Sequence, residues 1–423
     1  MKGFITKFLV VFFLWFLSLS CIDRLDYNIS GRLNVVVVDG RITDIPTDEQ
    51  LVRINRSKAN EYNGRFGSTP ISEAKLELVI NGGEVVPFTE KKDIAGTYIL
   101  PHGFAGKVGQ SYQLRIQLKE GTQYESSIQV MPAVPKIEKL SVAFNPTNPF
   151  APLSNFRGTH DFYLDTQDPA DEHNYYSWEW DVYEKQDWCR TCVDGVYAVN
   201  NILPGQNMFY LYYVSGNELY EDCFNPSLNY IAGYPPLLKR NWYYDYLCRT
   251  KCWEILHNQE MNIFDDINTN GGKILGRKVA QIPFYQRVPC LAEIRQTSLT
   301  SEAFLYYQHF QEQISNAGGV ADTPPTALIG NIHNIANPKE AVVGFFTASS
   351  VAKIRYWLDR KDTDGVVPPG LFMALHSRAP VEEPAPPDNG YIMIWGGPPR
   401  VPTALCLESE SRTANKPEGW QDY

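Results

Sequence analysis

The sequence predicts a mainly β protein with an N-terminal β-sandwich followed by a larger mainly β domain that contains one substantial helix. Three observations lead to this fold class. Short runs alternate apolar and polar residues, as half-buried strands do. Gly, Pro and Asn turn signals separate these runs at intervals of roughly 8 to 12 residues, which is typical of sandwiches. A single segment has the helical period instead.

The first twenty residues have the three parts of a secretory signal. Lys2 and Lys7 make a cationic start, residues 8–19 are an apolar run, and small or polar residues precede Cys21. The apolar run is shorter than the about 20 residues that a membrane-spanning helix needs. We therefore expect residues 1–20 to be a cleaved signal peptide.

The residues before Cys21 also suit a lipoprotein signal. Lipoprotein signal peptidases favour a small residue directly before the cysteine, here Ser20, and a Leu three residues before it, a position flanked by Leu17 and Leu19. We expect cleavage before Cys21 and acylation of its thiol, which would anchor the mature chain because each buried methylene contributes about 0.8 kcal/mol. No later segment approaches a transmembrane length. The alternative is an ordinary signal peptide with a chance cysteine.

The predicted β-sandwich covers residues 33–135 and follows a short polar tether at 21–32. Its expected strands are the alternating or β-branched runs at 33–38, 50–55, 74–80 and 111–118. Asn81-Gly82-Gly83 predicts a hairpin, because a type I′ turn needs positive φ at both central residues. About 100 residues with this strand spacing fit an immunoglobulin-like or prealbumin-like sandwich.

Prolines mark the boundary between the two domains. Five prolines lie between residues 131 and 152, and proline fixes φ and lacks an amide donor, so we expect a connection there and a boundary near Pro135. The second domain is expected to span 136–361. Its predicted strands lie at 161–165, 175–183, 208–214, 262–264 and 285–296.

One segment of the second domain, residues 301–317, predicts a helix. Thr300 is a suitable N-cap, Gly318-Gly319 a suitable stop, and Glu302 lies where the helix dipole favours an anion. Its apolar residues recur at helical spacing: Ala303, Tyr307, Phe310 and Ile314. We expect this helix to cover an end or a face of the sheet. Beyond it, residues 362–423 are rich in Pro and Gly and are expected to be irregular.

Composition limits the class of partner. The chain has 423 residues, 43% hydrophobic and 13% aromatic, enough for two domains with real cores. Its formal net charge of −10 becomes −12 once Lys2 and Lys7 leave with the signal. Nucleic acid is therefore excluded as a main ligand, because it requires clustered Lys and Arg.

Seven cysteines remain besides Cys21, and in an exported protein they predict disulfides. The candidate disulfide cysteines are Cys189, Cys192, Cys223, Cys248, Cys252 and Cys290. Two close pairs, Cys189 with Cys192 and Cys248 with Cys252, could alternatively hold zinc through four thiolates. The odd count leaves at least one thiol unpaired.

Residues 266–271 (DINTNG) reproduce the first half of a calcium-binding loop, in which alternate oxygens surround the ion. The twelfth position holds Arg277 rather than the bidentate Glu that such a loop needs. We therefore interpret this segment as an Asx-rich β-turn, and we expect no metal site.

No catalytic motif is found: the sequence has no Gly-x-Ser-x-Gly elbow, no His-Glu-x-x-His helix and no phosphate loop. We expect a protein that is not an enzyme and needs no cofactor. Aromatic residues are dense between 175 and 246, including Trp178, Trp180, Trp188 and Trp242. Exposed rings would stack on sugars or anchor a protein interface, but most are expected to lie in the core.

Short motifs follow one another along almost the whole mature chain. They are LNVVVVDGRIT at 33–43, PISEA at 70–74, GTY at 96–98, YES at 124–126, CW at 252–253, LTSEAFLYY at 299–307, GNI at 330–332, VGFFTASS at 343–350 and KPEGW at 416–420. In this order they resemble a family of Bacteroidetes outer-membrane lipoproteins, domain of unknown function 4249. Family members often carry a second cysteine three residues after Cys406, where this chain has Ser409, so the resemblance does not support a cystine there.

The resemblance implies that the gene lies near genes of TonB-dependent receptors. It leads us to expect a non-enzymatic accessory of a TonB-dependent transporter in the outer membrane, which captures a ligand or caps the β-barrel. Asp23 and Asp26 favour the cell surface, since acidic residues after the lipidated cysteine direct lipoproteins there in this phylum. The alternatives are a surface hydrolase or glycan-binding adhesin that acts alone, and a structural envelope subunit.

Overall fold

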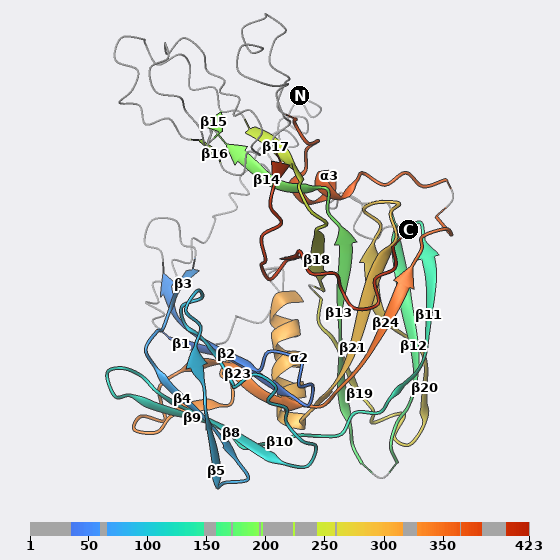
Figure 1. Ribbon diagram of the computed structural model, residues 1–423. Coiled ribbons are helices and arrows are strands. Elements are labelled where there is room, and N and C mark those ends of the chain that lie inside the picture. Colours follow the sequence, from blue (N-terminus) through green and yellow to red (C-terminus); the bar gives the residue numbers. More distant parts are fainter. Residues whose placement is uncertain are drawn as a thin grey trace, which may run out of the picture.

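The computed structural model describes residues 35–59, 66–147, 158–170, 172–193, 196–197, 223–224, 243–258, 260–315, 328–363, 365–382 and 403–422. The predicted signal peptide, Cys21, the tether, the predicted strand at 208–214 and the predicted stop at Gly318-Gly319 lie outside these residues. Within them the chain is mainly β, as predicted, with the helices α2 (Ser301–Ser315) and α3 (Leu371–His376) (Figure 1). No helix in the described part is both long and apolar enough to cross a membrane.

Two sheets form the part that we call the N-terminal module. Sheet A contains β1 (Val36–Thr43), β2 (Leu51–Ala59), β3 (Phe66–Pro70), β6 (Thr89–Glu90), β7 (Thr97–Ile99) and β23 (Val342–Ser349). Sheet B contains β4 (Lys75–Ile80), β5 (Glu84–Pro87), β8 (Ser111–Gln117), β9 (Gln123–Ser126), β10 (Gln129–Val130) and β22 (Ile332–Asn334). Alternate side chains of both sheets, among them Val38, Ile54, Leu78 and Leu114, form one hydrophobic core.

The predicted hairpin joins β4 to β5. Ile80 pairs with Glu84, and the amide of Gly83 donates to the carbonyl of Ile80 at 3.0 Å. Asn81 and Gly82 have φ of 50° and 70°, the left-handed values that this turn requires. The hairpin prediction is confirmed.

Strands β22 and β23 pair with strands of the N-terminal module, although we assigned them to the second domain. Strand β23 runs parallel to β1, and Ile332, Val342 and Phe346 are buried in the N-terminal core. Parallel neighbours need long connections, so the local pattern of β23 does not reveal which strand it joins. The strand itself was visible in the sequence, but its sheet was not.

Two further sheets form the central module. Sheet C contains β11 (Ile137–Asn145), β12 (Thr159–Gln167) and β20 (Lys273–Pro283). Sheet D contains β13 (Tyr175–Lys185), β18 (Trp253–His257), β19 (Asn262–Asp265), β21 (Cys290–Leu299), β24 (Val351–Leu358) and β26 (Arg412–Thr413). Phe162 and Ile282 of sheet C and Trp178 and Ile294 of sheet D belong to one buried cluster.

Strand β11 corrects the prediction that the proline-rich stretch is only a connection. The prolines flank the strand, with Pro135 before it and Pro146 after it, and none lies within it. The strand is at the edge of its sheet, next to β12. The strand predicted at 285–296 began and ended too early, because β21 spans Cys290–Leu299.

Segments that connect the two modules are joined by hydrogen bonds to one backbone carbonyl. Ser298, at the end of β21, and Ser350, between β23 and β24, both donate through Oγ to the carbonyl of Pro132, at 2.9 and 2.7 Å. An inter-module ion pair joins Arg295 Nη1 to Asp48 Oδ2 at 2.7 Å. These contacts fix the central module against the N-terminal module.

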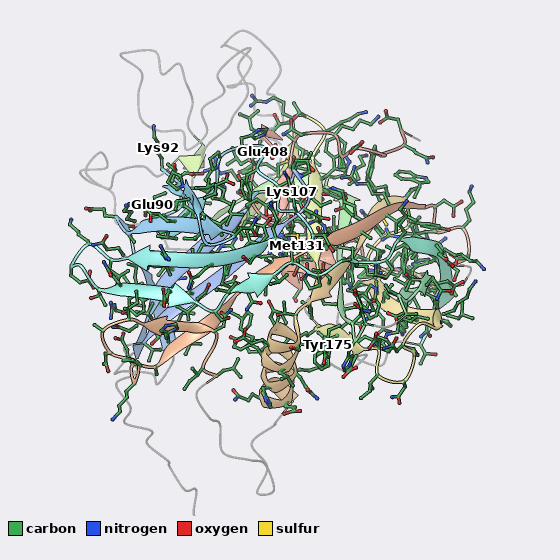
Figure 2. All side chains as sticks on the ribbon, turned by 90° about the horizontal axis from the view of Figure 1, so that it is seen from below. Glu90, Lys92, Lys107, Met131, Tyr175 and Glu408 are labelled. Carbon is green, nitrogen blue, oxygen red and sulfur yellow. A yellow bond between two sulfur atoms is a disulfide. The ribbon has the colours of Figure 1, made fainter. Side chains whose placement is uncertain are left out.

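Helix α2 also lies at this junction. Its N-cap is confirmed, because the amide of Ala303 donates to Thr300 Oγ1 at 3.2 Å. Phe304 stacks on Tyr175 of sheet D at 4.7 Å between ring centroids, and Tyr306 packs on Phe345 of sheet A at 4.9 Å. Figure 2 shows Tyr175 beside the helix. The helix therefore touches both modules. Phe310, which we placed on its apolar face, is 40% exposed.

Candidate functional site

Five cysteines gather at one end of the central module: Cys189, Cys192, Cys248, Cys252 and Cys406. Strands β14 (Trp188–Val193) and β17 (Tyr243–Cys248) are antiparallel, and β25 (Thr403–Ala404) pairs with β17 in parallel (Figure 1). A separate two-stranded ribbon joins β15 (Val196–Tyr197) and β16 (Cys223–Phe224). We call β14, β17, β25 and the cysteines around them the cystine module.

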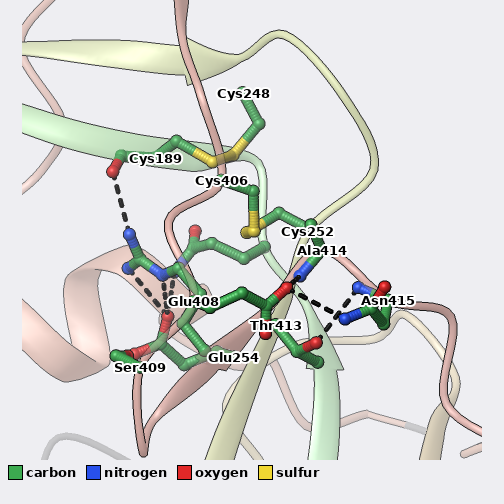
Figure 3. The surroundings of a disulfide bond; sticks show 12 residues. Cys189, Cys248, Cys252, Glu254, Cys406, Glu408, Ser409, Thr413, Ala414 and Asn415 are labelled. Atoms are coloured by element: carbon green, nitrogen blue, oxygen red, sulfur yellow. Dashed lines mark hydrogen bonds and ion pairs between the residues drawn. A yellow bond between two sulfur atoms is a disulfide. The ribbon is translucent and has the colours of Figure 1, made fainter. Parts of the chain in front are cut away.

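Two disulfides cross this module (Figure 3). Cys189 is bonded to Cys248, with Cα atoms 4.8 Å apart and 59 residues between them in sequence. Cys252 is bonded to Cys406, with Cα atoms 5.6 Å apart and a sequence separation of 154. Cys192 is also in a disulfide, whereas the side chain of Cys223 lies outside the described residues.

Two cysteines differ from the expectation. Cys406, whose cystine we doubted, is the partner of Cys252. Cys290, which we named as a candidate, is a free thiol in the core between sheets C and D, where burial raises its pKa to about 12. Its position in an apolar strand run was the available signal, because such a side chain faces packed core rather than a loop.

The alternative zinc site of four thiolates is not formed. The sulfur atoms of Cys189, Cys248 and Cys252 lie within 4.8 Å of one another. All three, and Cys192, are in disulfides, and zinc requires deprotonated free thiols. The cluster is therefore a crosslinked core and not a metal centre.

Charged residues secure the cystine module to the rest of the protein. Arg412 of β26 donates to Glu254 Oε2 at 2.8 Å and to the carbonyl of Cys189 at 2.8 Å (Figure 3). Asp245 of β17 accepts from both Arg378 and Thr191. Burial opposes the charged form of Asp245, but these hydrogen bonds outweigh it and lower its pKa.

The last residues of the chain dock on sheet D, so the segment expected to be irregular is ordered by contacts. Trp420 is 7% exposed and packs edge-on against Trp253 and Trp357, at 5.6 and 5.0 Å between ring centroids. Between 362 and 423 the described residues hold α3, β25 and β26, all short. Long-range pairing produces the two strands, and a local pattern does not indicate it.

In the dense segment, the aromatic side chains that the structure describes are buried or partly buried. Trp178 is 1% exposed and donates from Nε1 to Gln296 at 3.0 Å, and Trp188 packs against Phe372. Trp242 lies outside the described residues. These rings support the folded core and do not form an exposed stacking surface among the described residues.

The segment 266–271 forms a turn, as expected. The amide of Thr269 donates to the carbonyl of Asp266 at 2.6 Å, and the amide of Ile267 donates to Asp265 Oδ1 at 2.8 Å. Arg277, at the twelfth position of the supposed calcium loop, places its guanidinium over the rings of Trp178 and Phe264. The geometry and the sequence therefore both disagree with an EF-hand calcium-binding loop.

Comparison with known proteins identifies one family. No curated protein and no solved structure matches this chain. Residues 22–355, most of the chain after the predicted signal peptide, match the family described as "Domain of unknown function (DUF4249)". The match covers the N-terminal module, most of the central module and the cysteines up to Cys290. The chain therefore belongs to the DUF4249 family.

Proposed function

We propose that this protein is a lipid-anchored accessory of a TonB-dependent transporter in the outer membrane, exposed at the cell surface, where it captures a ligand or caps the barrel without catalysing a reaction. The observation that carries the proposal is the acylation motif that ends at Cys21. Membership of the DUF4249 family also supports the proposal, because genes of this family are expected to lie near genes of TonB-dependent receptors.

Contacts between the modules support the proposal of a single anchored body. The about 15 residues between Cys21 and β1 can span at most about 50 Å when extended. Strand β1 lies inside sheet A, between β2 and β23, and the following loop carries Asp48, which pairs with Arg295 of the central module. An anchor at Cys21 would therefore hold both modules near the membrane surface.

The anchor is tested with Cys21→Ala in membrane fractionation. We expect the variant to appear as an uncleaved or soluble product, because acylation is the proposed source of membrane retention. Cys290→Ala is the matched control, because it removes a thiol that lies buried in the core. Full retention of Cys21→Ala in the membrane fraction would contradict the anchor.

The partner is tested by purifying the lipoprotein from the native membrane in mild detergent. A β-barrel partner in equal amount is the expected result. Recovery of the lipoprotein alone would instead favour an adhesin, a hydrolase or an envelope subunit. Protease treatment of intact cells tests the surface location, and complete protection beside a digested surface control would contradict it.

A further inference from the structure

A histidine and two aspartates come together at the end of sheet D where β13 begins and β19 ends. These strands are antiparallel, and Tyr175 pairs with Asp265. His173, two residues before Tyr175, therefore lies beside Asp265 and Asp266. His173 is 92 positions before Asp265, and the two aspartates are adjacent in sequence, so the strand register brings the histidine to them.

The ligand atoms of the three side chains converge. His173 Nε2 lies 2.6 Å from Asp265 Oδ1 and 3.5 Å from Asp266 Oδ1. All three atoms lie within 4.8 Å of one another. His173 is 43% exposed on its side chain, so solvent and ions reach one side of the group.

Asp266 provides a second and independent observation. It is fully buried, and its Oδ1 atom has no hydrogen-bond partner, whereas Oδ2 accepts from the amide of Asn174 at 2.9 Å. A buried carboxylate oxygen without a partner is uncommon, because desolvation is then uncompensated. This oxygen lies 3.5 Å from His173 Nε2, on the partly exposed side of the group.

Neighbouring groups add negative charge and orient the cluster. Asp168, 1% exposed, accepts from Tyr176 Oη at 2.6 Å and from the amide of Gly271 at 3.0 Å. On the other side of the ring, His173 Nδ1 lies 3.4 Å from Tyr175 Oη. A cation bound at this cluster would offset the electrostatic repulsion between its carboxylates and that of Asp168.

We propose that His173 Nε2, Asp265 Oδ1 and Asp266 Oδ1 bind one zinc ion, with water as the fourth ligand. Zinc accepts imidazole nitrogen and carboxylate oxygen at about 2.0–2.2 Å and is usually tetrahedral, which places its ligand atoms about 3.4 Å apart. The separation of 3.5 Å between His173 Nε2 and Asp266 Oδ1 fits this value. The 2.6 Å contact between His173 Nε2 and Asp265 Oδ1 opens when the ion takes the place of the proton between them, which is released to solvent. Calcium requires six to eight oxygen ligands, and this set contains a nitrogen.

The test uses the full mature lipoprotein in mild detergent, oxidised and alkylated, after removal of metals with a chelator. Calorimetric titration with Zn²⁺ alone should give one equivalent and a higher melting temperature. His173→Gln should lower the affinity at least tenfold and abolish the rise in melting temperature. Asp265→Asn, at a partly exposed position, should weaken binding in the same way and guards against a folding defect in a single variant.

His257→Gln is a matched control. His257 also lies 2.6 Å from an aspartate, Asp181, but its second ring nitrogen contacts the carbonyl of Glu410 at 2.9 Å, so the protein occupies both nitrogens. This variant should bind zinc as the unaltered protein does. Three results would overturn the proposal: no stoichiometric zinc in the unaltered protein, equal binding by His173→Gln, or binding of calcium in preference to zinc.

Discussion

The N-terminal module and the cystine module are stabilised by different interactions. The core of the first is a large cluster of aliphatic and aromatic side chains from two sheets, including Val38, Leu78 and Phe346. The cluster of the second consists mainly of half-cystines, with Tyr246 and Ala404. One module is held by burial, and the other by covalent bonds around a small buried volume.

The difference follows from the length of the strands. Strand β25 has two residues and pairs with β17 through two residues only, so it can bury little apolar surface. The bond between Cys252 and Cys406 brings this distant segment back and restricts the unfolded chain. Reduction should therefore loosen the cystine module and leave the N-terminal module folded.

The largest effect is expected in the aliphatic core. Phe346→Ala removes a fully buried ring that β23 contributes to the N-terminal module, and should lower the free energy of unfolding by about 3–5 kcal/mol. Chemical denaturation measures the loss, and hydrogen exchange should show it in β1 and β8. Val343→Ala, a partly buried neighbour, is the control and should cost clearly less. Equal losses would contradict the place of β23 in this core.

The double variant Cys252→Ala, Cys406→Ala tests the cystine module. Removing this bridge should lower its stability by about 2–4 kcal/mol, because the closed loop is long. Hydrogen exchange should increase in β17 and β25 but not in β4 and β8. If exchange rises equally in both modules, the two modules unfold as one cooperative unit, and the disulfide does not stabilise the cystine module separately.

Asp48→Asn tests whether the modules depend on each other. It weakens a partly buried ion pair with Arg295 across the junction, and Arg295 keeps a second partner, Glu293, at 2.8 Å. The loss should lie near the lower end of about 1.5–3 kcal/mol that hydrogen bonds to charged groups contribute. It should appear as faster exchange at both faces of the junction. Glu49→Gln, in an exposed pair with Lys91, is the control and should have little effect.

The smallest effect concerns the docking of the C-terminal segment near Glu410. A hydrogen bond to Asp181 outweighs the opposing effect of burial and raises the pKa of His257 from 6.5 to about 9. A raised pKa means that the stabilisation is complete below about pH 6.5 and is lost as the pH rises through about 9. The ring is half exposed, so the contribution should stay below about 1 kcal/mol.

This contribution is measured as the stability difference between the protein and His257→Gln at about pH 6 and about pH 10. The difference should be present at the lower pH and vanish at the higher one. His309→Gln on α2 is the control, because the contact of His309 with Glu312 is at the exposed surface. A difference for His257→Gln that persists at the higher pH would assign the effect to packing.

The sequence alone was a good guide where the determining signals are local. The hairpin at Asn81-Gly82 follows from turn chemistry, and α2 from its N-cap Thr300 and its helical period. Cystines were foreseeable from the number of cysteines in a chain with a predicted export signal. The pairing of Cys252 with Cys406 was not, because spacing does not encode a connection that closes 154 residues later.

What the sequence determined is the set of strands, the helix and the chemical class of the crosslinks, because period, turn residues and cysteine content act within a few residues. Only the tertiary structure decided that β23 completes the N-terminal core, that Cys290 is left in the central core, and that His173 meets Asp265 and Asp266. The physical reason is that each of these depends on strand register and on burial between segments far apart in sequence, which no local pattern specifies.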